Sequence, residues 1–437
     1  MLINDLVGVV GLDHCLTDPD LRAGYEVDWT GRYRGQTPAV VRPGSIEELS
    51  GVIALCHAAG QPVVVQGGNT GMVGGSVPLA GEVVVSIARL GNVQVLSDSA
   101  VQAGGGTTLA RVQKAAASIG ASFGVDTAAR DSATIGGMIA TNAGGMNVVR
   151  FGPMGDQLLD AGVVLADGRY LPSLQEVDPG DPANTLLAHL PGSEGILAVV
   201  AHATLQIDVD PPTTAVALIE VPPDRLVPLA GAVQALPSVY AMELFGAREV
   251  ALAAAGIGRS APLSAEWLLL VECRSESDPS AGLAAVVGDL PAVVAPNPTA
   301  GDELWLFREA LTEAVSRRGV PHKFDVRMPH VALSEVRSRV EGVVSGGAVY
   351  LWGHAYSNRH GEPIANLHIN ILGEVDDEAV FDVVEELGGS VAAEHGVGTA
   401  KRHRAAGARS DLDQLRVLKN RLDPAGILNP GVLLPPA

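Results

Sequence analysis

Cysteine, aromatic residues and positive charge are all scarce in this sequence. Three cysteines occur among 437 residues, Cys15, Cys56 and Cys273, and none belongs to a C-x-x-C pair. Such spacing excludes an iron–sulfur module and a disulfide framework, and it is typical of a reducing cytoplasm. Aromatic residues make up 4% of the chain and apolar residues 47%. The core must therefore be built mainly from aliphatic side chains and alanine.

The charge balance is strongly acidic and narrows the range of partners. Lysine and arginine number 29 against 49 acidic residues, a net charge of -20. This surface would repel a phosphate backbone, so nucleic acid is not an expected partner. The first residues lack the basic region of a secretion signal, and no apolar run is long enough to span a bilayer. We therefore expect a soluble, cytoplasmic protein without a membrane span.

The chain length and a proline-containing break in the sequence pattern predict two domains and a C-terminal segment. From about residue 40 to 210, short β-rich runs alternate with glycine-rich turns and alanine-rich helical patterns. These predict a strand over 62–68, a helix over 107–120 and a hairpin over 158–171. After Pro211 and Pro212, strands are expected over 214–222 and 266–273, and helices over 227–236 and 302–316. The predicted boundaries are 1–210, 211–395 and 396–437.

Three glycine loops lie within about 130 residues, at 66–75, 132–145 and 191–200. Glycine lets backbone amides approach an anion closely. The first is neither a P-loop nor a Rossmann G-x-G-x-x-G, because no GK[ST] ends it and no helical period follows it. One such loop is as readily an ordinary turn. Three of different type indicate a long, phosphate-bearing cofactor, without saying which.

Histidines gather in the segment 353–370, "GHAYSNRHGEPIANLHIN". In "ANLHINIL", strict alternation places Asn366, His368 and Asn370 on one face of a strand. A similar strand is expected to end at His354, and the later "AEHGVG" offers a Glu–His pair. Two histidines and a glutamate would form a three-ligand site for Zn²⁺ or Mn²⁺. The alternative, polar residues on a solvated sheet face, is favoured by spacing alone.

A second group of residues suits a carboxylate ligand. Arg308 and Thr312 are four residues apart on one expected helical face beside Trp305, and Lys323 follows. Arginine binds a carboxylate as a bidentate fork and lysine as a point charge. An exposed helical arginine next to Glu309 would need no such role, and this alternative stays open on the residues alone.

An ordered set of motifs carries a family resemblance over nearly the whole chain. "DWTGRYRG", "VVVQGGNTGMVGG", "TIGGMIATNAGG", "GVVLADG", "GSEG" and "NPGVLL" resemble the vanillyl-alcohol-oxidase flavoprotein superfamily, and within it the FAD-linked D-2-hydroxyacid dehydrogenases. The resemblance implies an α+β fold with a two-subdomain FAD-binding domain and an α+β substrate (cap) domain with an antiparallel sheet. The C-terminal helix is expected to return to the FAD domain.

The resemblance also implies how FAD is held. The residues implied are Gly67, Gly68, Asn69, Thr70, Gly71, Met72, Gly74 and Gly75 in the first loop; Asp126, Thr134, Gly136, Gly137, Ala140, Thr141, Asn142, Gly144 and Gly145 around the second; Glu194, Gly195 and Val199 in the third; and Asn429 near the end. Some relatives tether the flavin through a His or Cys. The first loop has neither, so we expect non-covalent FAD.

By the same resemblance, the histidine segment binds a metal and the cationic group binds substrate. His354, His368 and Glu394 would be the metal ligands, with zinc expected and manganese or iron as alternatives. Arg308, Thr312, Lys323 and Asn370 would hold the substrate, and His395 would be the base. One departure concerns the link between the histidines, which is about twice the family's usual length. His360 in that insert is the alternative ligand to His354, and we interpret it as an exposed loop residue.

The expected reaction is metal-assisted oxidation of a D-2-hydroxyacid to the 2-oxo acid, with D-2-hydroxyglutarate favoured over D-lactate. Electrons would then pass to an electron-transfer flavoprotein, a quinone or oxygen, and a homodimer is compatible with the family. The alternatives are a D-lactate or glycolate dehydrogenase, an alcohol- or sugar-oxidising flavoenzyme, and a non-catalytic flavin-fold subunit of an oxidase complex.

Overall fold

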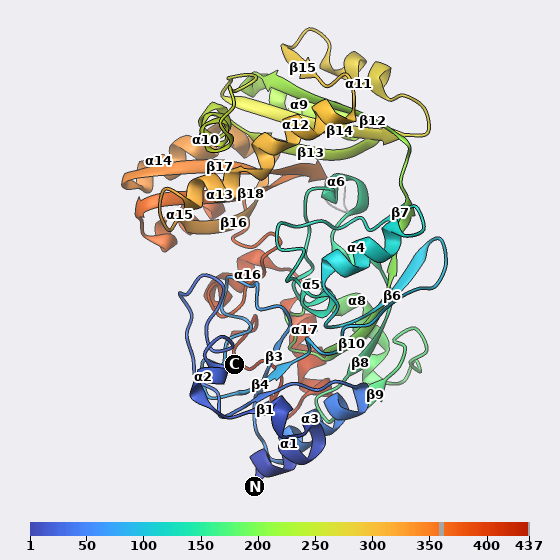
Figure 1. The fold of residues 1–437 in the computed structure, drawn as a ribbon. Helices are drawn as coiled ribbons and strands as arrows, with labels where there is room; N and C mark the ends of the chain where they lie inside the picture. The colour runs from blue at the N-terminus through green and yellow to red at the C-terminus, as the bar shows by residue number, and fades with distance from the viewer. Residues whose placement is uncertain (358–361, 436–437) are drawn as a thin grey trace. The chain divides into compact units, whose positions relative to one another are not determined.

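The computed structural model describes residues 1–357 and 362–435. The chain divides into two compact units: unit 1 comprises Met1–Gly144, Pro153–Asp210 and Glu394–Ala437, and unit 2 comprises Gly145–Gly152 and Pro211–Ala393. Both combine helices with sheets (Figure 1), which confirms the α+β class. The predicted boundaries at 210 and 395 stay a prediction.

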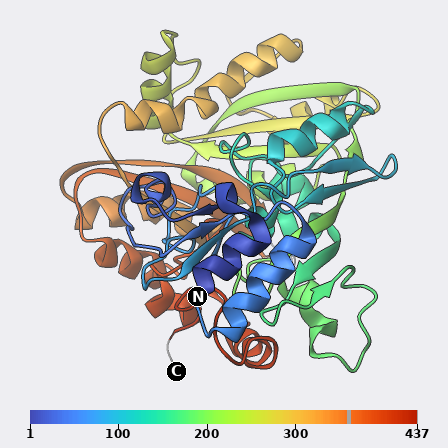
Figure 2. The ribbon, with the colours of Figure 1, turned by 60° about the horizontal axis from the view of Figure 1, so that its bottom comes forward.

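The described residues of unit 1 form three sheets. An apolar core lies between the four-stranded sheet and the helices α1 and α3. The sheets have the orders β1-β2-β4-β3, β5-β6-β10-β8-β9 and β11-β7. In the first, β2, β4 and β3 are parallel, so helices or loops must cross over between them. Figure 2 shows α1 and α3 side by side, and apolar residues of both belong to this core.

The strands of unit 1 are β1 (Cys15–Leu16), β2 (Val40–Val41), β3 (Val63–Gln66), β4 (Val83–Ser86), β5 (Val93–Val95), β6 (Ala100–Gly104), β7 (Ala121–Ser122), β8 (Leu158–Val164), β9 (Tyr170–Leu171), β10 (Val199–Gln206) and β11 (Asp208–Val209). Its α-helices are α1 (Leu2–Val10), α2 (Pro19–Arg22), α3 (Ile46–Ala58), α4 (Leu109–Ala117), α5 (Ile135–Thr141), α7 (Met154–Gln157), α8 (Leu186–His189), α16 (Ala405–Ala408) and α17 (Leu412–Leu422). The strand predicted over 62–68 is confirmed and ends at Gln66, and the helix within 107–120 and the hairpin of β8 and β9 are confirmed.

One predicted loop of unit 1 contains a helix. Residues 132–145 were expected to be irregular because of their glycines, but α5 occupies the middle of the segment. Ile135, Met138 and Ile139 are buried on it, and Asn142 ends it in the left-handed conformation. Burial of this apolar side outweighs the low helix propensity of two glycines.

Unit 2 is built on one seven-stranded antiparallel sheet with the order β15-β12-β14-β13-β17-β18-β16. Its strands are β12 (Thr213–Val221), β13 (Val239–Phe245), β14 (Trp267–Ser275), β15 (Ala292–Val294), β16 (His322–Pro329), β17 (Ser345–Ser357) and β18 (Pro363–Glu374). Its α-helices are α6 (Val148–Phe151), α9 (Pro223–Gln234), α10 (Ala247–Ile257), α11 (Ser280–Val287), α12 (Pro298–Glu309), α13 (Leu311–Ser316), α14 (Leu333–Val343) and α15 (Asp377–Glu386). The predicted antiparallel sheet is confirmed.

Both faces of this sheet carry helices. On one face, α10, α12 and α13 pack against an apolar cluster that includes Phe245, Leu270 and Trp352. On the other face, Phe324 of β16 meets Phe381 of α15 edge to face, with ring centroids 5.3 Å apart, a separation such pairs prefer. Because both faces are covered, a polar side chain on either face is buried and requires a partner.

Two predictions in unit 2 were imprecise. The helix expected over 302–316 is two helices, α12 and α13, separated at Ala310, so Arg308 and Thr312 lie on different helices. The strand expected to end at His354 runs on to Ser357, and it pairs with β18 as far as Pro363. Much of the insert between the histidines therefore lengthens this hairpin. His360 lies outside the described residues.

Among the described residues, none of the helices has the length and apolarity that crossing a membrane requires.

The C-terminal helix packs within unit 1, as predicted, and a buried ion pair ends it. Asp423 is 2% exposed and accepts bonds from Lys419 Nζ and from the amides of Ile427 and Leu428. Leu428 then forms a parallel bridge with Val63 at the start of β3, the strand that leads to the first glycine loop. Asp423 thus supports a segment beside the candidate cofactor loops.

Asp423→Ala should lower the free energy of unfolding by about 3–5 kcal/mol, the cost of leaving Lys419 as a buried, unpaired charge. Urea unfolding followed by circular dichroism measures the change. Asp289→Ala, which removes an exposed pair with Arg225, is the control and should cost less than about 1 kcal/mol. Equal effects of the two changes would show that the buried pair is not needed.

Candidate functional site

The register of four adjacent strands places the predicted polar residues of unit 2 on one face of its sheet. Residues directly opposite each other in an antiparallel pair point to the same face, as do alternate residues of one strand. The residues that share the face are Glu243 on β13, His354 on β17, Asn366, His368 and Asn370 on β18, and Lys323 and Asp325 on β16. The alternation expected for "ANLHINIL" is therefore confirmed.

The two predicted imidazoles approach each other on this face. The rings of His354 and His368 meet edge to face with centroids 5.5 Å apart. His354 is 4% exposed, and its Nδ1 donates to the carboxylate of Glu243. Because Nδ1 carries the proton, the Nε2 lone pair of His354 is the one that can bind a metal.

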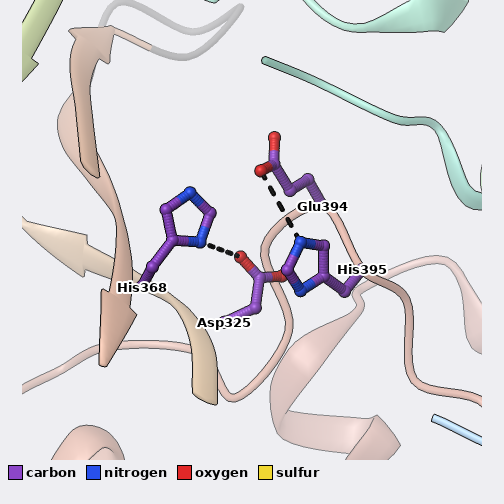
Figure 3. Close-up of side chains that lie close together, drawn as sticks. All are labelled: Asp325, His368, Glu394 and His395. Atoms are coloured by element: carbon purple, nitrogen blue, oxygen red, sulfur yellow. Dashed lines mark ion pairs between the residues drawn. The ribbon is translucent and has the colours of Figure 1, made fainter. Parts of the chain in front are cut away.

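His368 faces a carboxylate that the sequence did not single out. Asp325 Oδ1 lies 3.6 Å from His368 Nδ1. The amide of Ala393 donates to Asp325 Oδ2 at 3.2 Å. This hydrogen bond holds Ala393, the residue directly before Glu394, beside β16. Ligand atoms of Asp325, His368, Glu394 and His395 lie within 4.8 Å of one another (Figure 3). This donor set of two imidazoles and two carboxylates fits a divalent ion such as zinc. It contains two of the three predicted ligands, His368 and Glu394, and has Asp325 and His395 in place of His354.

The Glu394–His395 pair belongs to a turn that is fixed within unit 1. His395 Nε2 lies 3.9 Å from Glu394 Oε1. Two residues further on, the amides of Val397 and Gly398 both donate to the buried carboxylate of Glu194 at 2.7 Å. Burial raises the pKa of Glu194, against the opposing effect of these two amides. Glu194, predicted to contact the cofactor, thus also anchors the turn that follows the candidate base.

Arg308 is buried in unit 2 and is paired rather than solvated. It is 8% exposed, and its Nε donates to Glu243, the carboxylate that also accepts from His354. Burial raises the pKa of Glu243, but Arg308 and His354 together outweigh it and hold that pKa below its usual value. The alternative of an exposed helical arginine is therefore wrong.

The other predicted substrate residues lie on nearby elements of the same unit. Lys323 lies directly opposite Asn370, and burial lowers the pKa of the Lys323 ammonium. Asn370 is buried and donates weakly to the carbonyl of His368 at 3.3 Å. Thr312, at the start of α13, is half-buried. The substrate roles of all four residues stay predictions.

The glycine loops of unit 1 pack against each other too closely for side chains. A Cβ at Gly67 would lie 2.1 Å from Thr134 Oγ1, and one at Gly68 would lie 1.8 Å from the Ser132 carbonyl. A Cβ at Gly144 would meet Glu394 Oε2 at 2.6 Å. The first loop, the second loop and the Glu394 turn therefore form one glycine-lined cradle.

Backbone strain gathers in the same cradle. Among the described residues, the non-glycine positions with positive φ are Asn69, Asn142, Glu194, Asn429 and Leu433. Four of these five were predicted to contact the cofactor, and such strain is typical of ligand sites. Thr134 Oγ1 is buried there without a hydrogen-bond partner among the described residues, as expected of a group that awaits a ligand. The cradle fits an extended cofactor.

Several predicted cofactor residues also brace the protein itself. Asn429 accepts from the Val65 amide and donates to the Glu194 carbonyl. Asp126 accepts from Gln113 and Arg130, and burial raises its pKa. These bonds hold the loops in place whether or not a cofactor is present.

Sequence reasoning missed Glu243 and Asp325. Asp325 lies two residues from Lys323 in a strand pattern, so the alternation that placed His368 could have identified it. Glu243 is a single acid in the apolar strand "VYAMELF", which is a signal of a buried, partnered carboxylate.

Comparisons with known proteins identify the family of this chain. The FAD binding domain family matches residues 37–172, and the C-terminal domain of FAD linked oxidases matches residues 228–433. The chain is 32% identical to a D-2-hydroxyglutarate dehydrogenase of Xanthomonas citri pv. viticola, over 95% of this chain and 93% of that protein. It is 30% identical to the mitochondrial D-2-hydroxyglutarate dehydrogenase of Bos taurus, over 96% and 81%. A putative mitochondrial D-lactate dehydrogenase of Schizosaccharomyces pombe is 28% identical, over 96% and 86%.

Solved structures share the fold at low identity. An alkyldihydroxyacetonephosphate synthase has a TM-score of 0.76 at 15% identity, covering 98% of this chain and 84% of the other. The 4-ethylphenol oxidase from Gulosibacter chungangensis has a TM-score of 0.76 at 14% identity, covering 99% and 96%. With the sequence relatives, these confirm the fold and the family predicted from the motifs. The chain belongs to the FAD-linked D-2-hydroxyacid dehydrogenases of the vanillyl-alcohol-oxidase flavoprotein superfamily.

Proposed function

We propose that this protein oxidises a D-2-hydroxyacid to the 2-oxo acid with help from a divalent metal, and that D-2-hydroxyglutarate is preferred over D-lactate. The observation that carries the proposal is the shared sheet face. It combines metal-binding imidazoles with Lys323 and with the Glu243-held Arg308 in a protein of net charge -20. Such a concentration of fixed cationic groups suits an anionic substrate.

His354, His368 and Glu394 are the proposed metal ligands, with zinc as the expected ion and manganese or iron as alternatives. Asp325 faces His368 Nδ1 and orients that ring, as carboxylates commonly do for metal-bound histidines. When bound, the metal supplies a Lewis acid that lowers the pKa of the substrate hydroxyl.

The proposed substrate residues hold the acid by charge and hydrogen bonds. Arg308 is bonded to Glu243 through Nε, which leaves the terminal nitrogens of its guanidinium to form a fork with a carboxylate. Lys323 adds a point charge, and Thr312 and Asn370 add hydrogen bonds. Two cations beside a metal are best explained by a substrate with two carboxylates, as in D-2-hydroxyglutarate.

His395 is the proposed base. It takes the proton of the 2-hydroxyl as the C2–H bond breaks. Bound FAD, held without a covalent bond by the glycine cradle, supplies the acceptor for the hydride. The described cysteines are buried thiols and provide no second redox centre, so the two electrons leave to an external acceptor: an electron-transfer flavoprotein, a quinone or oxygen. We place the protein in the cytoplasm, where such thiols stay reduced.

D-Lactate is the competing substrate, because one relative is named a putative D-lactate dehydrogenase. A monoacid needs only the metal and one cation. Turnover of D-2-hydroxyglutarate should depend on both Arg308 and Lys323, whereas turnover of D-lactate should depend strongly on only one of them.

Anaerobic bleaching of the flavin tests the proposed function. D-2-Hydroxyglutarate should reduce it with a higher kcat/KM than D-malate and D-lactate, and the L-enantiomers should be inert. Arg308→Leu should lower kcat/KM for the diacid. The corresponding rise in activation free energy should be about 2–5 kcal/mol, the cost of leaving a buried carboxylate without its partner. The loss for D-lactate should be much smaller.

The control for Arg308→Leu is Arg337→Leu, which removes another arginine from a buried glutamate, Glu249, in the same unit. It should not change the diacid preference. Equal or better use of D-lactate by the wild type would contradict the preference and leave the reaction class intact. No bleaching by any D-2-hydroxyacid would contradict the proposed function.

Removal of a metal ligand should abolish metal binding and leave FAD bound. His354→Ala, His368→Ala and Glu394→Ala should each lower metal affinity by more than the roughly 10–100-fold that loss of an outer partner costs. Elemental analysis after dialysis measures bound metal. His330→Ala is the control, since this buried histidine donates to the Ile364 carbonyl. Full metal in the His354 variant with loss in His360→Ala would reverse the assignment.

Loss of the base should slow flavin reduction without releasing the metal. His395→Ala should reduce the stopped-flow rate by roughly 10²–10⁴-fold. His189→Ala, which changes a half-buried histidine of the same unit outside the candidate site, should reduce flavin at the wild-type rate. An unchanged rate in His395→Ala would show that another group takes the proton.

A further inference from the structure

One carboxylate in unit 2 connects the candidate metal site with the candidate substrate cation. Glu243 lies on β13, and its side chain is fully buried. One oxygen, Oε1, accepts from His354 Nδ1, and the other, Oε2, accepts from Arg308 Nε. Its strand neighbours Met242 and Leu244 are apolar and buried, so this acid interrupts an otherwise apolar strand.

A buried carboxylate of this kind is not retained for stability alone. Desolvating two charges costs about as much as their attraction returns, and apolar residues of similar volume often serve stability equally well. A leucine at 243 would continue the core formed by Phe245 and Leu270 on the same face. The presence of an acid therefore indicates a task that a leucine could not perform.

The two bonds of Glu243 perform such a task on each partner. Accepting from Nδ1 fixes the His354 tautomer and ring, and directs the Nε2 lone pair away from Glu243 toward the face shared with His368. Accepting from Nε restrains the plane of the Arg308 guanidinium and leaves its two terminal nitrogens to donate to another acceptor. Because one rigid group makes both bonds, the metal ligand and the carboxylate fork keep a constant separation.

We propose that Glu243 is the positioning residue that sets metal affinity through His354 and substrate affinity through Arg308. The inference rests on the proposed function, since it assumes that His354 binds the metal and Arg308 the substrate carboxylate. Glu243 itself touches neither. Its role is to hold a 2-hydroxyacid's carboxylate and hydroxyl at the spacing that both partners require.

Unit 2 provides a matched control. Glu249 is also fully buried and also pairs with an arginine, Arg337, at 2.9 Å. Its other bonds are from the backbone amides of Gly246 and Leu351. Glu249 thus has the same chemistry and burial as Glu243, without contact to a candidate ligand or substrate residue.

The test compares Glu243→Gln, Glu243→Leu and Glu249→Gln in the full chain. Metal affinity is measured by titrating the metal-free protein with Zn²⁺ against a chelating indicator, and KM and kcat with D-2-hydroxyglutarate. Glutamine keeps an acceptor for His354 but presents no charge to Arg308. Glu243→Gln should therefore raise KM by roughly tenfold or more with little change in metal affinity. Glu243→Leu should raise KM and also weaken Zn²⁺ by roughly 10–100-fold.

A second comparison applies if a single variant fails to fold, because Glu243→Leu leaves Arg308 buried and unpaired. The double variant Glu243→Leu/Arg308→Leu contains no unpaired buried charge, and Arg308→Leu alone keeps the Glu243–His354 bond. Weaker Zn²⁺ binding in the double variant than in Arg308→Leu is expected. Equal Zn²⁺ affinity in these two proteins would overturn the inference.

Measurements on the wild type distinguish a failure of the inference about Glu243 from a failure of the proposed function. If it binds Zn²⁺ and is bleached by the hydroxyacid while the Glu243 variants behave like Glu249→Gln, only the inference about Glu243 is overturned. If the wild type binds no metal and is not bleached, the proposed function fails, and the role of Glu243 fails with it.

Discussion

The antiparallel register of β13, β17, β18 and β16 is the constraint on which the candidate site depends. A shift of one residue between any two of these strands would turn the polar set of one strand to the opposite face. His368 would then point toward the side covered by α15, and its contact with His354 would be lost. The long β17–β18 ladder, extended by the insert to Ser357 and Pro363, stabilises this register with additional pairs. The strand pairs that border the segment between His354 and His368 thus reinforce the candidate site.

Buried carboxylates orient the candidate site in both units. Glu194 holds the turn that follows His395 through two amides, and Glu243 holds His354 and Arg308 through side-chain bonds. Each is costly to bury and is compensated by hydrogen bonds to a group of candidate function. In a protein this acidic, the negative charges in the interior have a different purpose from those on the surface. The interior ones fix geometry, whereas the surface ones set the overall field.

Patterns with short range in the sequence predicted the fold and much of the candidate site. Alternation in "ANLHINIL" identified the face of His368, and glycine loops identified the cofactor cradle, because both signals are local. The ordered motifs then predicted the family. Local patterns could mark Glu243 and Asp325 as candidates, but could not identify their partners, Arg308, His354 and the amide of Ala393, because these are distant in the chain. The helix α5 and the break at Ala310 escaped because tertiary burial, rather than propensity, decides them.

The central claim is that the residues gathered on this sheet face act through a bound divalent metal. It is tested most directly by anaerobic stopped-flow reduction of the flavin by D-2-hydroxyglutarate before chelation, after chelation and after Zn²⁺ is added back. The account predicts that chelation removes the metal, leaves FAD bound and slows flavin reduction by orders of magnitude, and that Zn²⁺ restores the rate. Reduction at the original rate by a protein shown to be free of metal would contradict it.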